Sequence, residues 1–281
     1  MVENHLGQKL LIDNINYKLI KADGLTPAGA TINQAGVGIE DGTSYNSSYV
    51  KSRNIVLTIV PEGNFNGNIE RKRMDLYRYF KPKYRVKLYI KTAYRNVCIN
   101  GYVESVEGDL FSKKQNFQVS IICPKPFFED ITPVTALQRF VDDEFYFPVS
   151  IPKEGITLSS VNSRERVIID NKGDETTGII ISMSANNNVI KPTIYNITTR
   201  KTFSFDCNMT AGDVVVIDTR RGTKTITLYR NGFENNILNT MVSGSHWFEV
   251  PTGTNDFTYR CEYGEENLKV NYKLYPLYEG V

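Results

Sequence analysis

The sequence has 281 residues, of which 41% are hydrophobic and 23% charged, and its formal net charge is +2. This length suits two domains better than one small core, and the composition excludes a chain that is disordered throughout. A net charge so near zero argues against a polyanion binder that relies on non-specific attraction. Because no run of 18 apolar residues occurs and residues 1–10 lack a continuous apolar segment, we expect no membrane insertion and no secretory signal, and therefore synthesis in the cytoplasm.

Aromatic and β-branched residues dominate the apolar part of the sequence, which contains 17 Tyr and 14 Phe. Such residues favour strands, and abundant Gly and Asn supply the turns that many short strands need. In the first half we predict strands at residues 9–12, 17–22, 53–60, 85–92, 96–106 and 116–123. Residues 28–42, rich in Gly, Ala and Asn, predict a loop, and Asn100 with Gly101 predicts a bulge inside a strand.

One helix is predicted among these strands. Asn68 can cap its start, and Pro82 prevents it from continuing beyond residue 81. One stripe at helical spacing, mainly apolar but including Arg73, would be formed by Ile69, Arg73, Leu76, Tyr77 and Phe80.

The opposite face of this helix is charged and mainly basic. The simplest interpretation is that this face is exposed to solvent, and the alternative is that it contacts an acidic neighbouring subunit. The candidate subunit-contact residues are Arg71, Lys72 and Arg78.

Proline punctuates the middle of the chain, at positions 124, 126, 133, 148 and 152. Because proline stiffens a connection and blocks regular strand pairing, the domain boundary is predicted near residues 131–140. The predicted domains are residues 1–130 and residues 131–281.

The second half has a simpler pattern of short β-prone segments separated by turn residues. Many short strands at regular spacing predict a β-sandwich or barrel. The predicted strands are residues 156–158, 167–171, 178–183, 189–196, 201–205, 213–218, 225–228, 247–250, 256–262 and 268–274.

Residue types that carry catalysis or metal binding are sparse or poorly spaced. His5 and His246 lie at no usual metal-ligand spacing from any cysteine, and the four cysteines form no CxxC pair, so we expect free thiols. The sequence has no GxSxG elbow, no GxxxxGK[ST] loop and no GxGxxG motif. Asp142, Asp143 and Glu144 are adjacent carboxylates, not a pair facing across a cleft. We therefore predict no catalytic residue, no cofactor and no metal, and a protein that is not an enzyme.

Carbohydrate binding is the one binding chemistry that the residues keep open. Trp247 is the only tryptophan. Glu249 would share its face if Phe248 and Val250 point inward, and an indole beside a carboxylate could cradle a sugar. The competing interpretation is that Trp247 is an ordinary core aromatic. Trp247 and Glu249 are the candidate carbohydrate-contact residues.

Several stretches of the first half resemble the N-terminal domain of siphophage distal tail proteins. They are RNIVL (53–57), RMDLYRYF (73–80), INGYVE (99–104) and FQVSIICPKPFF (117–128). In the second half, AGD (211–213), IDT (217–219), NG (231–232) and PTGTN (251–255) resemble the β-sandwich domain of the longer members of this family. The family often has Pro-Gly-x-Asn where this chain has Thr252, Gly253, Thr254 and Asn255, and Gly253 still supplies the turn.

The resemblance implies a mainly β fold of two domains. An N-terminal β-sandwich-type domain with one α-helix would build a hexameric ring, and galectin-like C-terminal β-sandwiches would project outward. It implies a structural protein at the virion tail tip, or baseplate. Its expected partners are other copies of the chain, the major tail or tail tube protein, a tail-associated hub or lysin protein, and receptor-binding proteins, with DNA only passing through the channel.

Two other classes of function are weighed against this hub. A carbohydrate-binding module would recognise host cell-wall saccharides as its main role, and a wall hydrolase would cleave them. An assembly protein should be oligomeric without ligand, whereas a simple lectin need not be. The hydrolase lacks a credible catalytic constellation.

Overall fold

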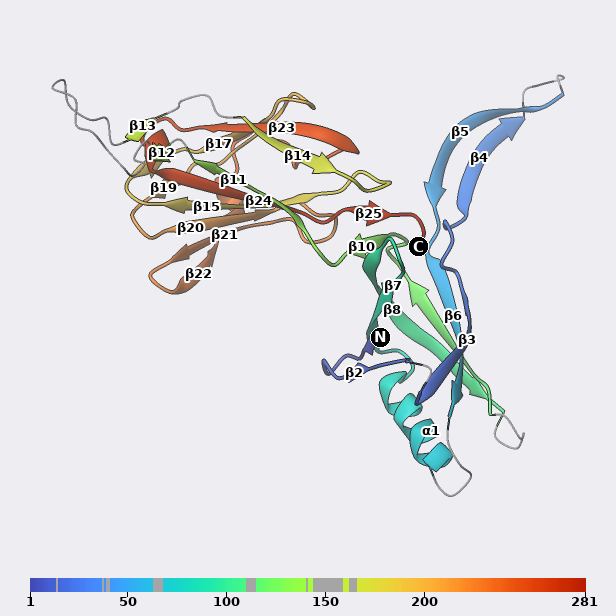
Figure 1. Cartoon of the computed structure of the whole chain (residues 1–281). Coiled ribbons are helices and arrows are strands. Elements are labelled where there is room, and N and C mark those ends of the chain that lie inside the picture. The colour runs from blue at the N-terminus through green and yellow to red at the C-terminus, as the bar shows by residue number, and fades with distance from the viewer. Residues whose placement is uncertain are drawn as a thin grey trace. The chain divides into compact units, whose positions relative to one another are not determined.

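The computed structural model describes residues 1–13, 15–36, 38, 41–62, 68–109, 115–139, 141–143, 159–161 and 166–281. The chain forms two compact units (Figure 1): unit 1 is residues 1–131 with residues 277–281, and unit 2 is residues 132–276. The predicted domains, 1–130 and 131–281, differ from these units at residue 131, which belongs to unit 1, and at the C-terminus. The last five residues pack with unit 1.

Unit 1 is built on one antiparallel sheet, here called the main sheet, with the strand order β2-β1-β7-β8-β9-β6-β3. Two short strands, β10 and β25, pair with each other, and β10 also pairs with β8. The bounds are β1 (Val2–Glu3), β2 (Lys9–Leu10), β3 (Tyr17–Asp23), β6 (Arg53–Pro61), β7 (Arg85–Lys91), β8 (Asn96–Gly108), β9 (Phe117–Cys123), β10 (Phe128–Asp130) and β25 (Leu277–Tyr278).

Alternation along the central strands decides which face of the main sheet is buried. In β6, Ile55, Leu57 and Ile59 are buried while the residues between them are more exposed. The helix α1 (Asn68–Tyr79) packs against the buried face, where Leu76 and the following Phe80 are fully buried. The predicted helix is thus confirmed, but its predicted stripe is buried only in part: Ile69 and Arg73 are half-buried, and Tyr77 is exposed.

The prediction of a bulge at Asn100 and Gly101 is wrong. Both residues pair in regular register with β7, and the irregularity in β8 lies between Val103 and Ser105. Gly101 is required for close packing instead. A Cβ at this position would lie 2.5 Å from Cγ2 of Ile121 and 2.8 Å from Sγ of Cys123, so a larger residue would clash. A glycine at this position lets β9 side chains fill the core beside β8.

The prediction of a loop over residues 28–42 is also wrong for most of its length. Strands β4 (Ala30–Gly36) and β5 (Thr43–Val50) form an antiparallel two-stranded sheet of their own (Figure 1). The sequence shows no alternation here because both faces of this hairpin are exposed.

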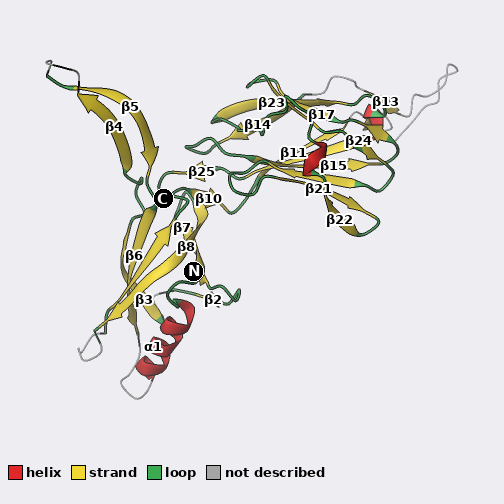
Figure 2. Cartoon of the chain, turned by 180° about the vertical axis from the view of Figure 1, so that it is seen from behind, coloured by secondary structure: helices red, strands yellow, loops and turns green. Residues whose placement is uncertain are grey.

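Unit 2 is a sandwich of two antiparallel sheets (Figure 2). The larger sheet has the order β11-β24-β15-β20-β21-β22, and the smaller sheet has the order β14-β23-β17-β18. The larger sheet comprises β11 (Val134–Arg139), β15 (Ile179–Ala185), β20 (Val214–Asp218), β21 (Thr225–Arg230), β22 (Phe233–Asn236) and β24 (Leu268–Leu274). The smaller sheet comprises β14 (Val167–Asn171), β17 (Thr193–Asn196), β18 (Lys201–Ser204) and β23 (Gly253–Arg260).

Aromatic side chains from both sheets fill the space between them. Phe257 of β23 contacts Tyr272 of β24 with ring centroids 5.3 Å apart, and Phe248 meets Phe257 edge to face at 5.6 Å. Short elements complete the unit: β12 (Val141–Asp143), β13 (Ser159–Val161), β16 (Val189–Ile190), β19 (Asn208–Met209), η1 (Leu238–Thr240) and η2 (Glu265–Asn267). The expectation of a mainly β fold with a C-terminal β-sandwich is confirmed.

Two of the predicted strands in unit 2 are corrected and one cannot be compared. The predicted strand 247–250 is not a strand, and Val250 forms only an isolated bridge to Thr177. The predicted strand 189–196 is divided into β16 and β17, because Lys191 has a positive φ of 48° that no continuous strand accommodates. The predicted strand 156–158 lies outside the described residues.

Arg53 fastens the last residues of the chain to unit 1. Its side chain is 3% exposed, and its guanidinium lies 4.5 Å from the centroid of the Phe128 ring. It donates hydrogen bonds to backbone carbonyls of Pro126 (2.7 Å) and Gly24 (2.6 Å), and also to those of Thr26 and Glu279. One cation therefore satisfies four carbonyls from three segments.

We predict that Arg53→Met lowers the free energy of unfolding of unit 1 by about 3 kcal/mol, because carbonyls left without a donor cost roughly 1–3 kcal/mol each. Hydrogen exchange should show faster opening at residues 277–281. The control is Arg85→Met, which removes an exposed guanidinium bonded to Asn100. Equal effects of the two variants would show that Arg53 is not a fastening point.

A second buried charge stabilises unit 2. Asp213, 3% exposed at its side chain, receives Nη2 of Arg230 at 2.6 Å and the backbone N–H of Thr210 at 2.7 Å. The hydrogen bond from Arg230 is the main cause that lowers the pKa of Asp213, and the Thr210 bonds add to it. A carboxyl with a lowered folded pKa stabilises the fold above its unfolded pKa of roughly 4, and loses that effect as pH falls through the folded value.

We predict that Asp213→Asn costs unit 2 about 1–2 kcal/mol at pH 7, a range reduced because the Arg230 side chain is 38% exposed. Below about pH 4 the difference from the parent should shrink, because the parent carboxylate itself becomes protonated. Urea unfolding between pH 3 and pH 7 measures this. The control is Glu262→Gln, which removes an ion pair with Lys191 whose two side chains are both exposed. If this control changes stability with pH as much as Asp213→Asn does, the Asp213 carboxylate is not the stabilising group.

Candidate assembly surface

The two-stranded hairpin β4–β5, here called the arm, is the most unusual surface of unit 1. Its strands read ATINQAG and TSYNSSYV and contain no charged residue. β-Branched and aromatic residues favour the extended backbone, and Gly42, with a φ of 111°, lies at the turn just before β5. The register shifts between Asn33 and Gln34, which adds local twist.

One face of the arm, here called the apolar face, exposes two large apolar side chains beside the polar Gln34 and Ser48. Ile32 is 60% exposed and Tyr45 is 63% exposed. The pairing register places both on the same side as Ala30 and Val50. The Tyr45 hydroxyl lies 2.8 Å from Oγ of Ser48, which orients its ring on this face. On the other face, Nδ2 of Asn33 donates to Oγ of Ser47 at 3.0 Å.

Within the described residues of unit 1, no third strand pairs with the arm. A two-stranded hairpin is marginally stable in water unless a third strand or another layer covers it. Exposed strand edges in soluble proteins are usually protected by charges or prolines, and neither occurs in these two strands. The arm therefore has the composition of an element that another polypeptide covers.

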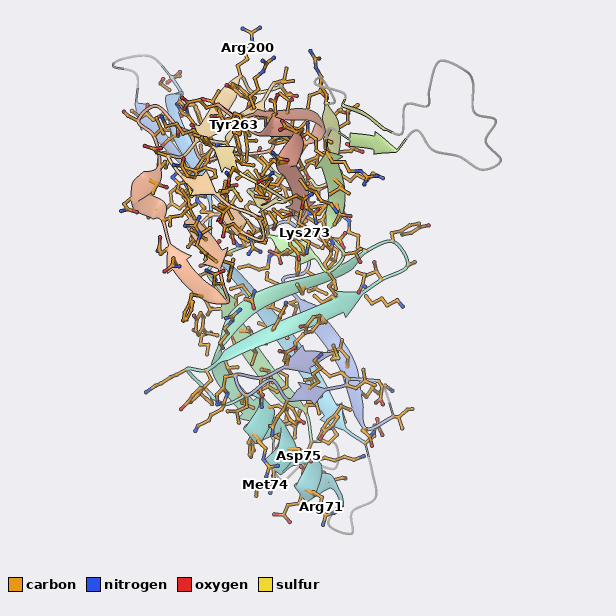
Figure 3. The ribbon with its side chains drawn as sticks, turned by 90° about the vertical axis from the view of Figure 1, so that its left-hand side faces the viewer. Arg71, Met74, Asp75, Arg200, Tyr263 and Lys273 are labelled. Atoms are coloured by element: carbon orange, nitrogen blue, oxygen red, sulfur yellow. The ribbon has the colours of Figure 1, made fainter. Side chains whose placement is uncertain are left out.

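The three predicted contact residues of the helix lie together along one groove. A groove of about 500 Å³ runs between α1 and residues 8–17, and Arg71, Lys72 and Arg78 all line it. Arg71 and Arg78 are exposed, and Asp75 also lines the groove. Figure 3 shows Arg71 and Asp75 on the helix. Nζ of Lys72 donates to the backbone carbonyl of Glu62, so this lysine already has a partner within the chain. Contact of these residues with a neighbouring subunit stays a prediction.

The groove beside α1 is lined by both negatively and positively charged side chains. Burial, followed by the negative charge of Asp75, raises the pKa of Tyr17 to about 12. The Tyr17 hydroxyl donates to the carbonyl of Lys72 at 3.3 Å and ties the strand β3 to the helix. A partner would thus meet alternating positive and negative side chains.

The predicted carbohydrate pair flanks a buried residue, and its indole is partly occupied. Phe248 and Val250 are buried, while Glu249 is exposed. Trp247 is half-buried, meets Phe203 edge to face at 5.1 Å, and has Nζ of Lys224 at 5.7 Å from its ring centroid. A sugar could stack on the indole only if Lys224 moved. Sugar contact at Trp247 and Glu249 remains a prediction.

Groups able to support chemistry are dispersed in the described part of the chain. There, no three His, Cys, Asp or Glu side chains gather as a metal-binding group. Cys123 and Cys261 are free thiols whose pKa values burial raises to about 11 and about 12. Asp142 and Asp143 lie in β12, and Glu144 lies outside the described residues. Among the described helices, none is long and apolar enough to cross a membrane.

Comparison with known proteins gives matches in both sequence and fold. Residues 172–274 match the family model described as siphovirus-type tail component, C-terminal domain. No curated protein matches the sequence. The solved structure of SPP1 Dit, described as a paradigm of the hub adsorption apparatus in phages that infect Gram-positive hosts, matches with a TM-score of 0.68 at 10% identity. The match covers 98% of each chain.

Two structures of the phage p2 baseplate in its activated conformation also match. The form with Ca has a TM-score of 0.54 at 13% identity, and the form with Sr has a TM-score of 0.56 at 12% identity. Each match covers 95% of this chain and 93% of the other. The chain therefore has the fold of SPP1 Dit along nearly its whole length, and its residues 172–274 are similar to the C-terminal domain of siphovirus-type tail components.

Proposed function

We propose that this chain is a structural hub of a phage tail tip, or baseplate, whose copies assemble into a hexameric ring through unit 1. The observation that carries the proposal is the arm, which exposes Ile32, Tyr45 and Tyr49 on strands without a charge. The fold shared with SPP1 Dit and the p2 baseplate component supports it. The role is structural and not catalytic.

The shape of the arm favours a ring over a twofold dimer. An arm that inserts against a different surface of the next copy makes a heterologous contact, and heterologous contacts close into rings when the rotation fits. The groove beside α1, lined by Arg71, Lys72 and Arg78, offers a second surface for neighbours.

In this proposal the ring joins the tail tube protein on one side to a tail-associated hub or lysin protein on the other. Receptor-binding proteins attach at its periphery, and DNA passes through its channel. The chain is synthesised in the host cytoplasm and ends in the virion. Contact of Trp247 and Glu249 with a cell-wall saccharide is a separate proposal, which loss of glycan binding in Trp247→Ala would support.

Charges placed on the apolar face of the arm should prevent assembly. We predict that Ile32→Asp with Tyr45→Asp turns the oligomer into monomers of about 32 kDa, because each carboxylate would be desolvated without a partner. Light scattering over a concentration series measures the mass, and circular dichroism checks that the strands remain.

The matched control is Ile168→Asp with Tyr263→Asp, two unit 2 side chains that are 64% and 62% exposed and so equally accessible. This variant should keep a mass near six protomers. If the parent chain is monomeric at every concentration, or if both double variants assemble normally, the arm is not the ring contact.

A further inference from the structure

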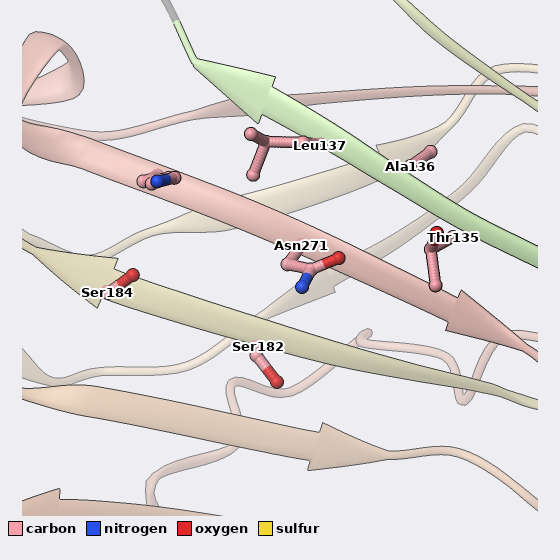
Figure 4. Close-up of a pocket in the computed structure, with 7 residues that line it drawn as sticks. Thr135, Ala136, Leu137, Ser182, Ser184 and Asn271 are labelled. Atoms are coloured by element: carbon pink, nitrogen blue, oxygen red, sulfur yellow. The ribbon is translucent and has the colours of Figure 1, made fainter.

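A shallow groove of about 600 Å³ lies on the outer face of the larger sheet of unit 2, across β11, β24 and β15 (Figure 4). Figure 4 shows Asn271 at its centre, with Leu137 and Thr135 on the β11 side and Ser182 and Ser184 on the β15 side. The lining residues are Thr135, Ala136, Leu137, Ser182, Ser184, Lys269 and Asn271.

Strand alternation fixes this lining. In β24, Val270 and Tyr272 are buried in the core, so Lys269 and Asn271 point to the outer face. The register then sets Asn271 opposite Ser182, and Lys269 opposite Ser184. Polar side chains of the two strands thus lie side by side in pairs.

The groove has positive charge without a compensating carboxylate. Lys269 lines it, and Lys273 follows on the same face of β24, exposed. No Asp or Glu is among the lining residues. On the same face, Asp218 pairs with Ile180 in the register, and its carboxylate is held by Arg220 at 2.8 Å. Within the described residues, neither lysine has an ion pair.

The polar groups of the groove are also free to bind. Hydroxyls of Thr135, Ser182 and Ser184 and the amide of Asn271 can each donate and accept a hydrogen bond. None of these four side chains has a hydrogen-bond partner within the described part of the chain. Groups of this kind match the hydroxyls of a sugar or polyol.

The composition of the groove is unlike that of a protein interface. Interface centres are enriched in Tyr, Trp, Phe, Met and Arg and depleted in Ser, Ala and Lys. Here the lining has two serines, an alanine and a lysine, and no aromatic residue. An acidic protein segment would find charge here but no pocket for an apolar anchor.

We propose that this groove binds an anionic polyhydroxyl chain, made of sugar or polyol units that carry phosphate or carboxylate groups. The hydroxyl and amide side chains contact the hydroxylated backbone of the ligand, and the lysines contact its anionic groups. Lys269 and Lys273 are four residues apart on a strand, about 13 Å along its axis, which suits successive charges of a chain better than one small anion. The site is distinct from the arm and from Trp247.

The test uses the full chain and four probes: phosphorylated maltohexaose, unmodified maltohexaose, inorganic phosphate and a hexaglutamate peptide. We expect weak binding of the phosphorylated hexasaccharide by calorimetry, with a Kd on the order of 0.1–1 mM that weakens as salt increases. Lys269→Glu with Lys273→Glu should weaken it at least tenfold, and Asn271→Ala at least threefold. The matched control, Lys91→Glu with Lys172→Glu, makes the same change in net charge at exposed positions outside the groove and should stay within twofold.

The proposal is overturned if none of the probes binds, if inorganic phosphate binds as tightly as the phosphorylated hexasaccharide, or if the control loses binding equally. Tighter binding of a hexaglutamate peptide than of the phosphorylated sugar would also overturn it and point to an acidic protein partner. In light scattering, the groove variants should have the same oligomer mass as the parent chain. If the probes do not bind but this mass is that of a ring, the groove proposal fails and the ring proposal stands.

Discussion

The fold depends on one buried cation that closes the chain on itself. Arg53 donates hydrogen bonds to the carbonyl of Gly24, which follows β3, and to that of Pro126, which lies between β9 and β10. It also donates to the carbonyl of Glu279, which is 226 residues away in sequence. The pairing of β10 with β25 and the hydrogen bond from the Val281 N–H to the Leu25 carbonyl hold the same segment. Unit 2 therefore begins and ends at neighbouring strands of unit 1, so that the sequence of unit 2 is an insertion into that of unit 1.

Both ends of the unit 2 segment are therefore held by paired strands of unit 1. A domain joined by one strand can be lost by local fraying, whereas one joined by two paired strands requires the β10–β25 ladder and the Arg53 bonds to break together. The charge of Arg53 is satisfied by neutral carbonyls and by the ring of Phe128 at 4.5 Å, and among the described residues no carboxylate is hydrogen-bonded to it. Such an anchor is less sensitive to salt than a surface ion pair.

Sequence patterns predicted the regular elements well where one face is buried. Residues 268–274 alternate strictly and form β24 over the same range, and Leu76 and Phe80 revealed the helix by their spacing. The arm was missed because a hairpin exposed on both faces has no alternation to detect. The partners of Arg53 could not be foreseen, because they are backbone carbonyls brought together by the fold. Gly101 suggested a bulge, but its neighbours Ile121 and Cys123 explain it by close packing.

The central claim is that the arm is completed by another copy of the chain. Hydrogen exchange of residues 30–36 and 43–50, measured by mass spectrometry on monomeric and assembled fractions, tests it most directly. We predict that these amides exchange within seconds in the monomer, as expected for a two-stranded hairpin without support, and are protected at least a hundredfold in the assembly. Equal exchange in both fractions would contradict the account, because the arm would then be uncovered in the ring.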